Sequence, residues 1–126
     1  MSPEIVSQAV KAYFAATRAM DQEAWVNSFA ADAVSYDPVG APAMHGHEKL
    51  AEFFQQIMSV FKEVGLTEDE VFIAGNGAAV KWSGRGISQG GNKVHFEGID
   101  VFEVNEAGKI QMLHAYWNPA EMMSQL

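Results

Sequence analysis

Two aspartates and one tyrosine stand out because their side chains can do acid–base chemistry from otherwise apolar surroundings. They are Tyr13, Asp37 and Asp100. If the three faced one apolar hollow, an ionised carboxylate could remove a proton from carbon. The phenol and a neutral carboxyl group could then donate hydrogen bonds to the oxyanion that forms. The residue types therefore indicate proton transfer on carbon, provided that the fold brings the three side chains together.

Asp37 lies in the segment "SYDPVG", directly after a short predicted strand over residues 34–36. One interpretation is turn chemistry, because an aspartate before a proline starts turns well and the residue before a proline favours extended backbone. The other is that the strand end aims the carboxylate into a hollow, with the proline and glycine behind it fixing its direction. The segment alone is compatible with both.

Asp100 interrupts an apolar face of a predicted strand over residues 93–104. Alternate positions place it on the same face as Phe96 and Phe102, so it is expected to point into the core or a cavity. Burial without a cation raises the pKa of a carboxyl group, which then stays protonated and can donate a hydrogen bond. The alternatives are a buried salt bridge, or a bulge at Gly98 that turns Asp100 outward.

Tyr13 lies on the inward row of the first predicted helix, with Ile5, Ala9 and Thr17. A buried tyrosine hydroxyl usually finds a hydrogen-bond partner. Tyr13 is therefore either a site residue or a core tyrosine bonded to a backbone carbonyl.

The sequence pattern of the elements that must position these residues changes near Gly65, from helical to strand periodicity. Apolar spacing predicts helices over about 3–17, 21–29 and 47–62, and a tail helix after Pro119 is compatible with the sequence. Alternation and turn residues predict strands over 34–36, 66–74, 78–88, 93–104 and 109–117. Helices followed by an antiparallel meander indicate a single α+β domain spanning residues 1–126, with a ligand hollow between helices and sheet.

Composition narrows the classes of partner. The net charge of −8, from 16 acidic and 8 basic residues, argues against nucleic acid and anionic membranes. There is no cysteine, so disulfides and thiolate metal sites are excluded. The pair His45 and His47 has no third ligand spaced with it, so no metal is predicted. The N-terminus resembles neither a signal peptide nor a membrane span, and a cytoplasmic location is expected.

Three stretches resemble bacterial Δ5-3-ketosteroid isomerases, members of the nuclear-transport-factor-two-like (SnoaL-like) superfamily. "VKAYFAATRAMDQEAWVNSFAADAVSYDPVG" (10–40) resembles their N-terminal half, and "GIDVFEVNEAGKIQMLHAYWNP" (98–119) resembles their C-terminal strands. "HGHEKLAEFF" (45–54) resembles the start of the third helix in the superfamily. The resemblance implies a cone-shaped domain with three N-terminal helices packed on a strongly curved, mostly antiparallel sheet.

The resemblance also implies roles for the three residues. Asp37 matches the base in a "DPVG" segment, Tyr13 matches an oxyanion-hole tyrosine, and Asp100 matches a protonated oxyanion-hole aspartate in an "I-D-x-F" context. The neutral oxyanion-hole aspartate is an established property of the isomerase family, and the alternation argument for Asp100 agrees with it. Phe54 and Phe29 stand where some of these isomerases have tyrosines that support the oxyanion-hole tyrosine.

The implied reaction moves a double bond of a 3-keto-Δ5-steroid into conjugation with the ketone, without a cofactor, in a homodimer paired through the outer sheet face. Another enzyme on the same fold (a polyketide cyclase, dehydratase or epoxide hydrolase) and a non-catalytic binding or pairing domain are the alternatives. Face assignment predicts the apolar lining to be Val39, Phe54, Met58, Trp82, Phe96, Met112, Tyr116 and Trp117.

Overall fold

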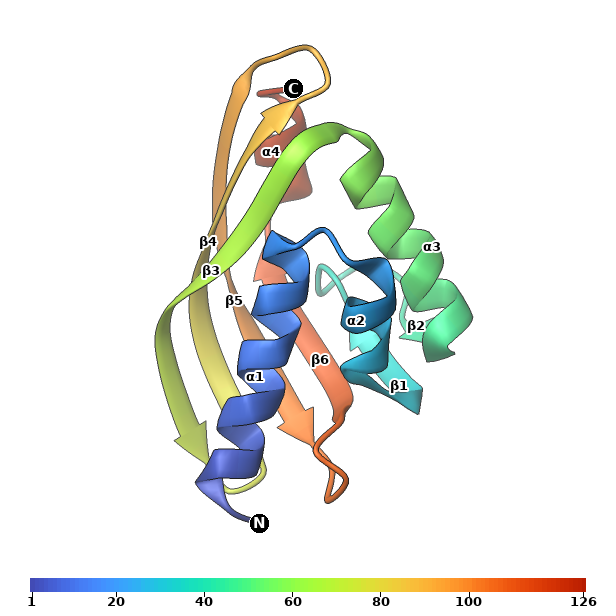
Figure 1. Cartoon of the computed structure of the whole chain (residues 1–126), viewed down its shortest axis with the longest axis vertical. Helices are drawn as coiled ribbons and strands as arrows, with labels where there is room; N and C mark the ends of the chain where they lie inside the picture. The colour runs from blue at the N-terminus through green and yellow to red at the C-terminus, as the bar shows by residue number, and fades with distance from the viewer.

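Helices from the N-terminal half cover one face of a six-stranded sheet in the computed structural model, which describes residues 1–126 (Figure 1). The helices are α1 (Pro3–Arg18), α2 (Gln22–Asn27), α3 (Gly46–Ser59) and a short α4 (Pro119–Met123). The strands are β1 (Phe29–Tyr36), β2 (Met44–His45), β3 (Phe61–Ala74), β4 (Gly77–Ser88), β5 (Lys93–Val104) and β6 (Ile110–Trp117). The predicted α+β class is confirmed.

Helix α1 begins and is buried as its sequence requires. The Ser2 hydroxyl accepts a hydrogen bond from the Ile5 amide at 3.4 Å, and Pro3 occupies the first turn, where no intrahelical N–H is needed. The buried side of the helix includes Tyr13 and Thr17. The Thr17 hydroxyl accepts from the Leu66 amide at 3.1 Å and ties the end of α1 to β3. This contact fixes the helix that carries Tyr13 against the sheet.

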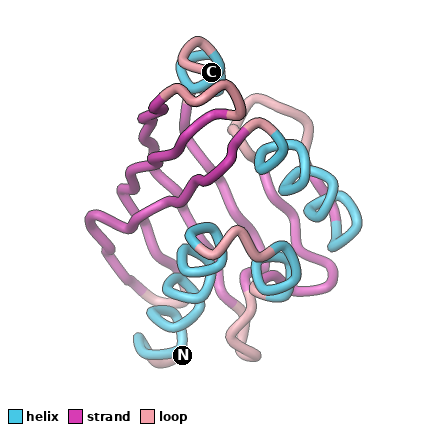
Figure 2. Tube along the Cα trace, turned by 45° about the horizontal axis from the view of Figure 1, so that its top comes forward, coloured by secondary structure: helices cyan, strands magenta, loops and turns pink.

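The sheet order, β2-β1-β6-β5-β4-β3, places distant parts of the chain side by side. All neighbouring strands are antiparallel except β1 and β6, which are parallel. In the β1–β6 register Tyr36 lies opposite His114, and the Val39 amide donates to the Ala115 carbonyl at 2.8 Å. Asp37 at the end of β1 therefore emerges beside the end of β6. The long strands β3, β4 and β5 curve around α1 (Figure 2).

Two predicted boundaries are wrong because buried aromatic residues extend the strands. Phe29, predicted in the second helix, begins β1 and is only 1% exposed. Phe61, predicted in the third helix, begins β3, pairs with Ser88 and is also buried. The short strand β2 has no counterpart among the predicted elements. None of the helices has the length and apolar character needed to cross a membrane.

Candidate active site

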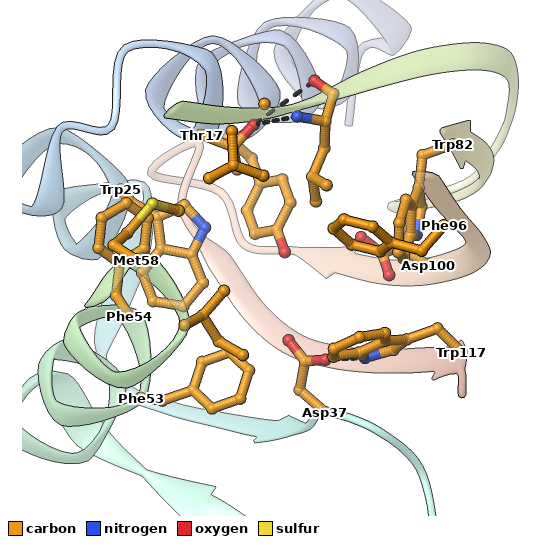
Figure 3. A pocket seen from close by; sticks show the side chains of 15 residues that line it. Thr17, Trp25, Asp37, Phe53, Phe54, Met58, Trp82, Phe96, Asp100 and Trp117 are labelled. Carbon is orange, nitrogen blue, oxygen red and sulfur yellow. Dashed lines mark hydrogen bonds between the residues drawn. The ribbon is translucent and has the colours of Figure 1, made fainter. Parts of the chain in front are cut away.

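A cavity lies between the helices and the concave face of the sheet, and all three chemically distinctive residues line it (Figure 3). The space between its walls, including the mouth, is about 530 Å³. Eleven of its fifteen lining residues are hydrophobic, and the others include Thr17, Asp37 and Asp100. No lysine, arginine, histidine, asparagine or glutamine is among the fifteen.

Asp37 reaches the cavity from the end of β1 and is held there by a tryptophan from β6. The indole N–H of Trp117 donates a hydrogen bond to Asp37 Oδ1 at 2.5 Å. Burial raises the pKa of Asp37 to about 6, and the bond from Trp117 opposes that rise. Asp37 also retains part of its surface toward the cavity. A carboxylate with this pKa is ionised at neutral pH and is a stronger base than a surface aspartate.

Asp100 points inward from β5 and is 1% exposed. The register between Gly98 and Glu103 is regular, and no cation forms a salt bridge with Asp100, so neither alternative interpretation of this residue holds. Both carboxyl oxygens lack a hydrogen-bond partner. Burial, followed by the charge of Asp37, raises the pKa of Asp100 well above its usual value. Burial therefore favours the neutral carboxylic acid, which has a proton to donate.

Tyr13 is 3% exposed and enters the cavity from α1. Its ring packs edge-on against Phe14 and Phe102, with ring centroids 4.9 and 5.0 Å away. The polar group that acts on its hydroxyl is the Trp25 side chain and not a backbone carbonyl, in contrast to the core-tyrosine interpretation. Burial, and then the carboxyl groups of Asp100 and Asp37, raise the pKa of Tyr13 well above 10.0. The phenol therefore keeps its proton at neutral pH.

The structure divides the eight residues predicted to form the apolar lining into two groups. Five of the eight residues lie in the cavity wall: Phe54, Met58, Trp82, Phe96 and Trp117. The other three do not line it and must be corrected. Val39 is 39% exposed in the loop after Asp37, while Met112 and Tyr116 lie on the opposite face of β6 from Trp117. Alternate residues of a strand face opposite sides, so the inward position of Trp117 excludes both Met112 and Tyr116 from the cavity.

Several cavity residues are absent from the predicted lining. They are Thr17, Trp25, Phe53, Ile57, Val64, Gly65 and Leu66. Phe53 and Ile57 follow from the helical spacing that placed Phe54 and Met58 inward. Val64 and Gly65 depend on β3 beginning before the predicted start at residue 66, and no local pattern in the sequence marks that earlier start.

The family follows from a match that covers most of the chain. Residues 10–112 match the family model of the SnoaL-like domain. The chain belongs to this SnoaL-like family. The superfamily to which the sequence was related is therefore confirmed, and the curved sheet with its helices agrees with it.

Solved structures with the same fold as this SnoaL-like domain include two enzymes named for epoxide chemistry. An epoxide hydrolase of Mycobacterium tuberculosis, described as LEH-like, has a TM-score of 0.77 at 21% identity, with 96% of this chain and 88% of that chain covered. SalBIII, an epoxide hydrolase/cyclase-like enzyme of pyran ring formation in the polyether salinomycin, has a TM-score of 0.81 at 23% identity, covering 92% of each chain.

RV0760c from Mycobacterium tuberculosis is a third solved structure with the same fold as this SnoaL-like domain. Its TM-score is 0.81 at 24% identity, and the alignment covers 96% of each chain. Identities this low establish a common fold. They do not transfer a substrate or a reaction, so the chemistry has to be argued from the cavity of the SnoaL-like domain itself.

The burial of Asp100 leads to a prediction about how stability depends on pH. Because the pKa of Asp100 is higher in the folded state, its contribution to stability is largest below its unfolded pKa of about 4. That contribution declines as pH rises, until the folded pKa is passed. We expect Asp100→Leu to be as stable as the wild type at pH 8, or more stable by about 1–3 kcal/mol. Denaturant melts at pH 5 and pH 8 measure the effect.

Asp100→Asn is the matched control, because it keeps the shape of the side chain and cannot titrate. The difference between wild type and Asp100→Asn should change with pH in the same direction as that between wild type and Asp100→Leu. Strong destabilisation by leucine at both pH values would identify Asp100 as a paired structural carboxylate and exclude it from an oxyanion hole.

Proposed function

We propose that this SnoaL-like domain is a steroid Δ-isomerase, which moves the Δ5 double bond of a 3-ketosteroid to Δ4. The observation that carries the proposal is the placement of one ionisable base, Asp37, and two neutral donors, Tyr13 and Asp100, on one apolar cavity. Opposite protonation states in one site are the requirement for proton transfer on carbon.

The reaction needs one base and no change in oxidation state. Ionised Asp37 takes the proton from carbon 4, and the electron pair of that C–H bond moves through the carbonyl to give a dienolate. Tyr13 and Asp100 donate hydrogen bonds to the dienolate oxygen, where the negative charge collects. Asp37 then returns the proton at carbon 6, which leaves the double bond conjugated with the ketone and the enzyme unchanged.

The cavity walls support a neutral, largely hydrocarbon substrate. Trp82, Phe96 and Trp117 form an aromatic wall with ring centroids 5.8–6.2 Å apart. Phe53 and Met58 from α3 lie on the helical side. No positively charged side chain lines the cavity, so a dienolate would rely on hydrogen bonds for its stabilisation.

Phe29 and Phe54 stand where some of the isomerases have tyrosines that support the oxyanion-hole tyrosine. Phe29 lies 5.9 Å from Tyr13 between ring centroids, and Phe54 packs on Trp25 at 5.0 Å. Neither phenylalanine can donate a hydrogen bond to the tyrosine. Tyr13 therefore acts as a single donor, without a chain of phenols behind it, and a lower rate than in isomerases with such a chain is expected.

Epoxide opening is the second candidate, because two of the structural relatives are named for it. A neutral acid could protonate the epoxide oxygen while Asp37 activates a water. The Thr17 hydroxyl is already bonded to the Phe14 carbonyl and the Leu66 amide, so only the three proposed catalytic side chains remain to hold that water. Isomerisation is favoured because it uses those three groups as one base and two donors and needs no positioned water.

The test mixes the protein with a Δ5-3-ketosteroid and follows ultraviolet absorbance, since the conjugated ketone absorbs strongly. In parallel, the protein is incubated with an apolar epoxide and the product is weighed by mass spectrometry. Growth of the conjugated absorbance supports the isomerase. An epoxide product heavier by one water, with no change in the ketosteroid, would replace the isomerase by a hydrolase.

The pKa of Asp37 predicts the pH dependence. Only the ionised carboxylate accepts a proton, so kcat/KM should rise with pH and level off above the folded pKa of about 6. A rate profile from pH 4 to pH 9 checks this. An acid limb centred near 4, the value of an ordinary aspartate, would mean that Asp37 is not buried in the working enzyme.

A homodimer through the outer sheet face is also proposed. Apolar side chains that are at least two-fifths exposed lie on the face of β3, β5 and β6 opposite Asp100: Phe72, Ile99, Val101 and Tyr116. Exposed apolar groups clustered on one sheet are typical of a protein–protein interface. Sedimentation velocity should give a dimer for wild type and a monomer for Val101→Lys. A wild type that remains monomeric at micromolar concentration would contradict the proposal.

A further inference from the structure

Three buried polar atoms without partners lie together on one wall of the cavity. They are the indole nitrogen of Trp82 and both carboxyl oxygens of Asp100. Trp82 is 2% exposed and Asp100 is 1% exposed, so both side chains are buried. Both line the same cavity, and the Trp82 indole N–H is close enough to the Asp100 carboxyl group to oppose the rise in its pKa. A donor and an acceptor, neither of them in a formed hydrogen bond, are therefore neighbours in this wall.

The sheet explains how the two side chains come together. Trp82 on β4 lies opposite Gly98 on β5, and Asp100 is two residues further along the same face. Diagonal neighbours of this kind are within reach of an aromatic side chain. A Cβ at Gly98 would lie 2.7 Å from a carbon of the Trp82 ring, so only glycine leaves room for the indole.

The chemistry of a neutral carboxyl group limits how the atoms can pair. It has one O–H donor, and its carbonyl oxygen is a better acceptor than its hydroxyl oxygen. The indole N–H is only a donor, so its preferred partner is the carbonyl oxygen. That arrangement leaves the Asp100 O–H as the atom that faces a ligand oxygen. It also satisfies every polar atom of the pair.

We propose that Trp82 is a positioning residue for Asp100: when a ketone occupies the cavity, the indole N–H donates to the Asp100 carbonyl oxygen and aims its O–H at the ketone oxygen. The proposal deepens the isomerase function and rests on it. Trp82 acts through Asp100 and does not contact the reacting carbons. A donated bond on one oxygen also polarises the carboxyl group, so that its O–H becomes a better donor.

A tryptophan indole would then act on each of the two aspartates, although the two carboxyl groups differ in protonation state. Trp117 donates to Asp37, which is the base and is ionised at neutral pH. Trp82 stands beside Asp100, where burial and the charge of Asp37 outweigh the opposing effect of the indole. The same side-chain type thus orients the base in one place and the acid in the other.

A double-mutant cycle tests whether Trp82 works through Asp100. We expect Trp82→Phe to lower kcat roughly 10-fold with little change in KM, as loss of one hydrogen bond to a catalytic group would do. In an Asp100→Leu background the same substitution should change kcat by less than about twofold. Phe96→Leu, on the same wall without a polar atom, is the control and should have an equal effect in both backgrounds. An equal loss for Trp82→Phe in both backgrounds would reduce Trp82 to a packing residue.

Phenol binding separates this proposal from the isomerase function, since it needs no turnover. A fused-ring phenol resembles the dienolate when it ionises, and its ultraviolet spectrum reports the ionised fraction. Trp82→Phe should weaken binding of the phenolate roughly 10-fold in wild type and hardly at all with Asp100→Leu. A protein that binds phenolate in this pattern but fails to isomerise would refute the reaction and keep the Trp82–Asp100 pair.

A measurement on unmodified Trp82 covers the case in which Trp82→Phe fails to fold. The chain has three tryptophans, so its ¹⁵N NMR spectrum has three indole N–H signals. The signal of Trp82 should move downfield when the phenol binds, and should not move in Asp100→Leu. A Trp82 signal that is unchanged by the phenol in the wild type would overturn the proposal.

Discussion

Asp37→Asn is expected to lower kcat for isomerisation by roughly 10²–10⁴-fold while steroid binding survives. The amide keeps the size of the carboxylate but cannot accept a proton from carbon. Tyr13 and Asp100, the other two titratable groups in the cavity, both have raised pKa values, which favours their protonated forms and leaves Asp37 as the base. Stopped-flow absorbance gives the rate, and quenching of tryptophan fluorescence gives the affinity.

Asp32→Asn is the matched control for this variant. Asp32 lies on the same strand, is exposed, and accepts a hydrogen bond from the Gln111 side chain at 3.0 Å, away from the cavity. It should retain full activity. Near-full turnover by Asp37→Asn would leave Asp37 as a turn residue only and would exclude the proposed mechanism.

Tyr13→Phe is the substitution with the second largest expected effect. Removal of one oxyanion donor raises the barrier by about 2.7–4 kcal/mol, a loss of roughly 10²–10³ in kcat. KM should change little, because the hydroxyl matters most when negative charge develops on the ligand oxygen. The ring contacts with Phe14 and Phe102 remain, so the fold should be stable.

Tyr36→Phe provides the comparison for the loss of a phenol. Tyr36 stacks on His114 with ring centroids 4.9 Å apart and does not line the cavity. It should have wild-type kinetics. If Tyr13→Phe weakened binding of a neutral ligand as much as it slowed turnover, the tyrosine would be a packing residue of the core.

Local periodicity is sufficient to place two of the three central residues. Asp100 follows from the alternation of its strand, and Tyr13 follows from the i, i+4 rows of a helix, because in both cases the surrounding residues are strongly apolar. Both side chains are buried as expected. Their position on a common cavity depends on the family resemblance, since spacing within an element says nothing about its partner elements.

Local sequence patterns do not predict the contacts between distant segments. The parallel pairing of β1 with β6 brings Trp117 to Asp37, which is 80 positions away in the sequence, and no local pattern predicts this pairing. The error at Met112 and Tyr116 has a different origin. Face assignment put them in the lining together with Trp117, although strict alternation along the strand places them on the face opposite Trp117.

The most direct test of the mechanism follows a single hydrogen atom. A Δ5-3-ketosteroid that carries deuterium at carbon 4 is converted in ordinary water, and the product is analysed by mass spectrometry and NMR. Transfer by one buried carboxyl group predicts a conjugated ketone in which a measurable share of the deuterium has moved to carbon 6. A conjugated product with no deuterium at carbon 6, or no conjugated product at all, would contradict the transfer of that proton by Asp37.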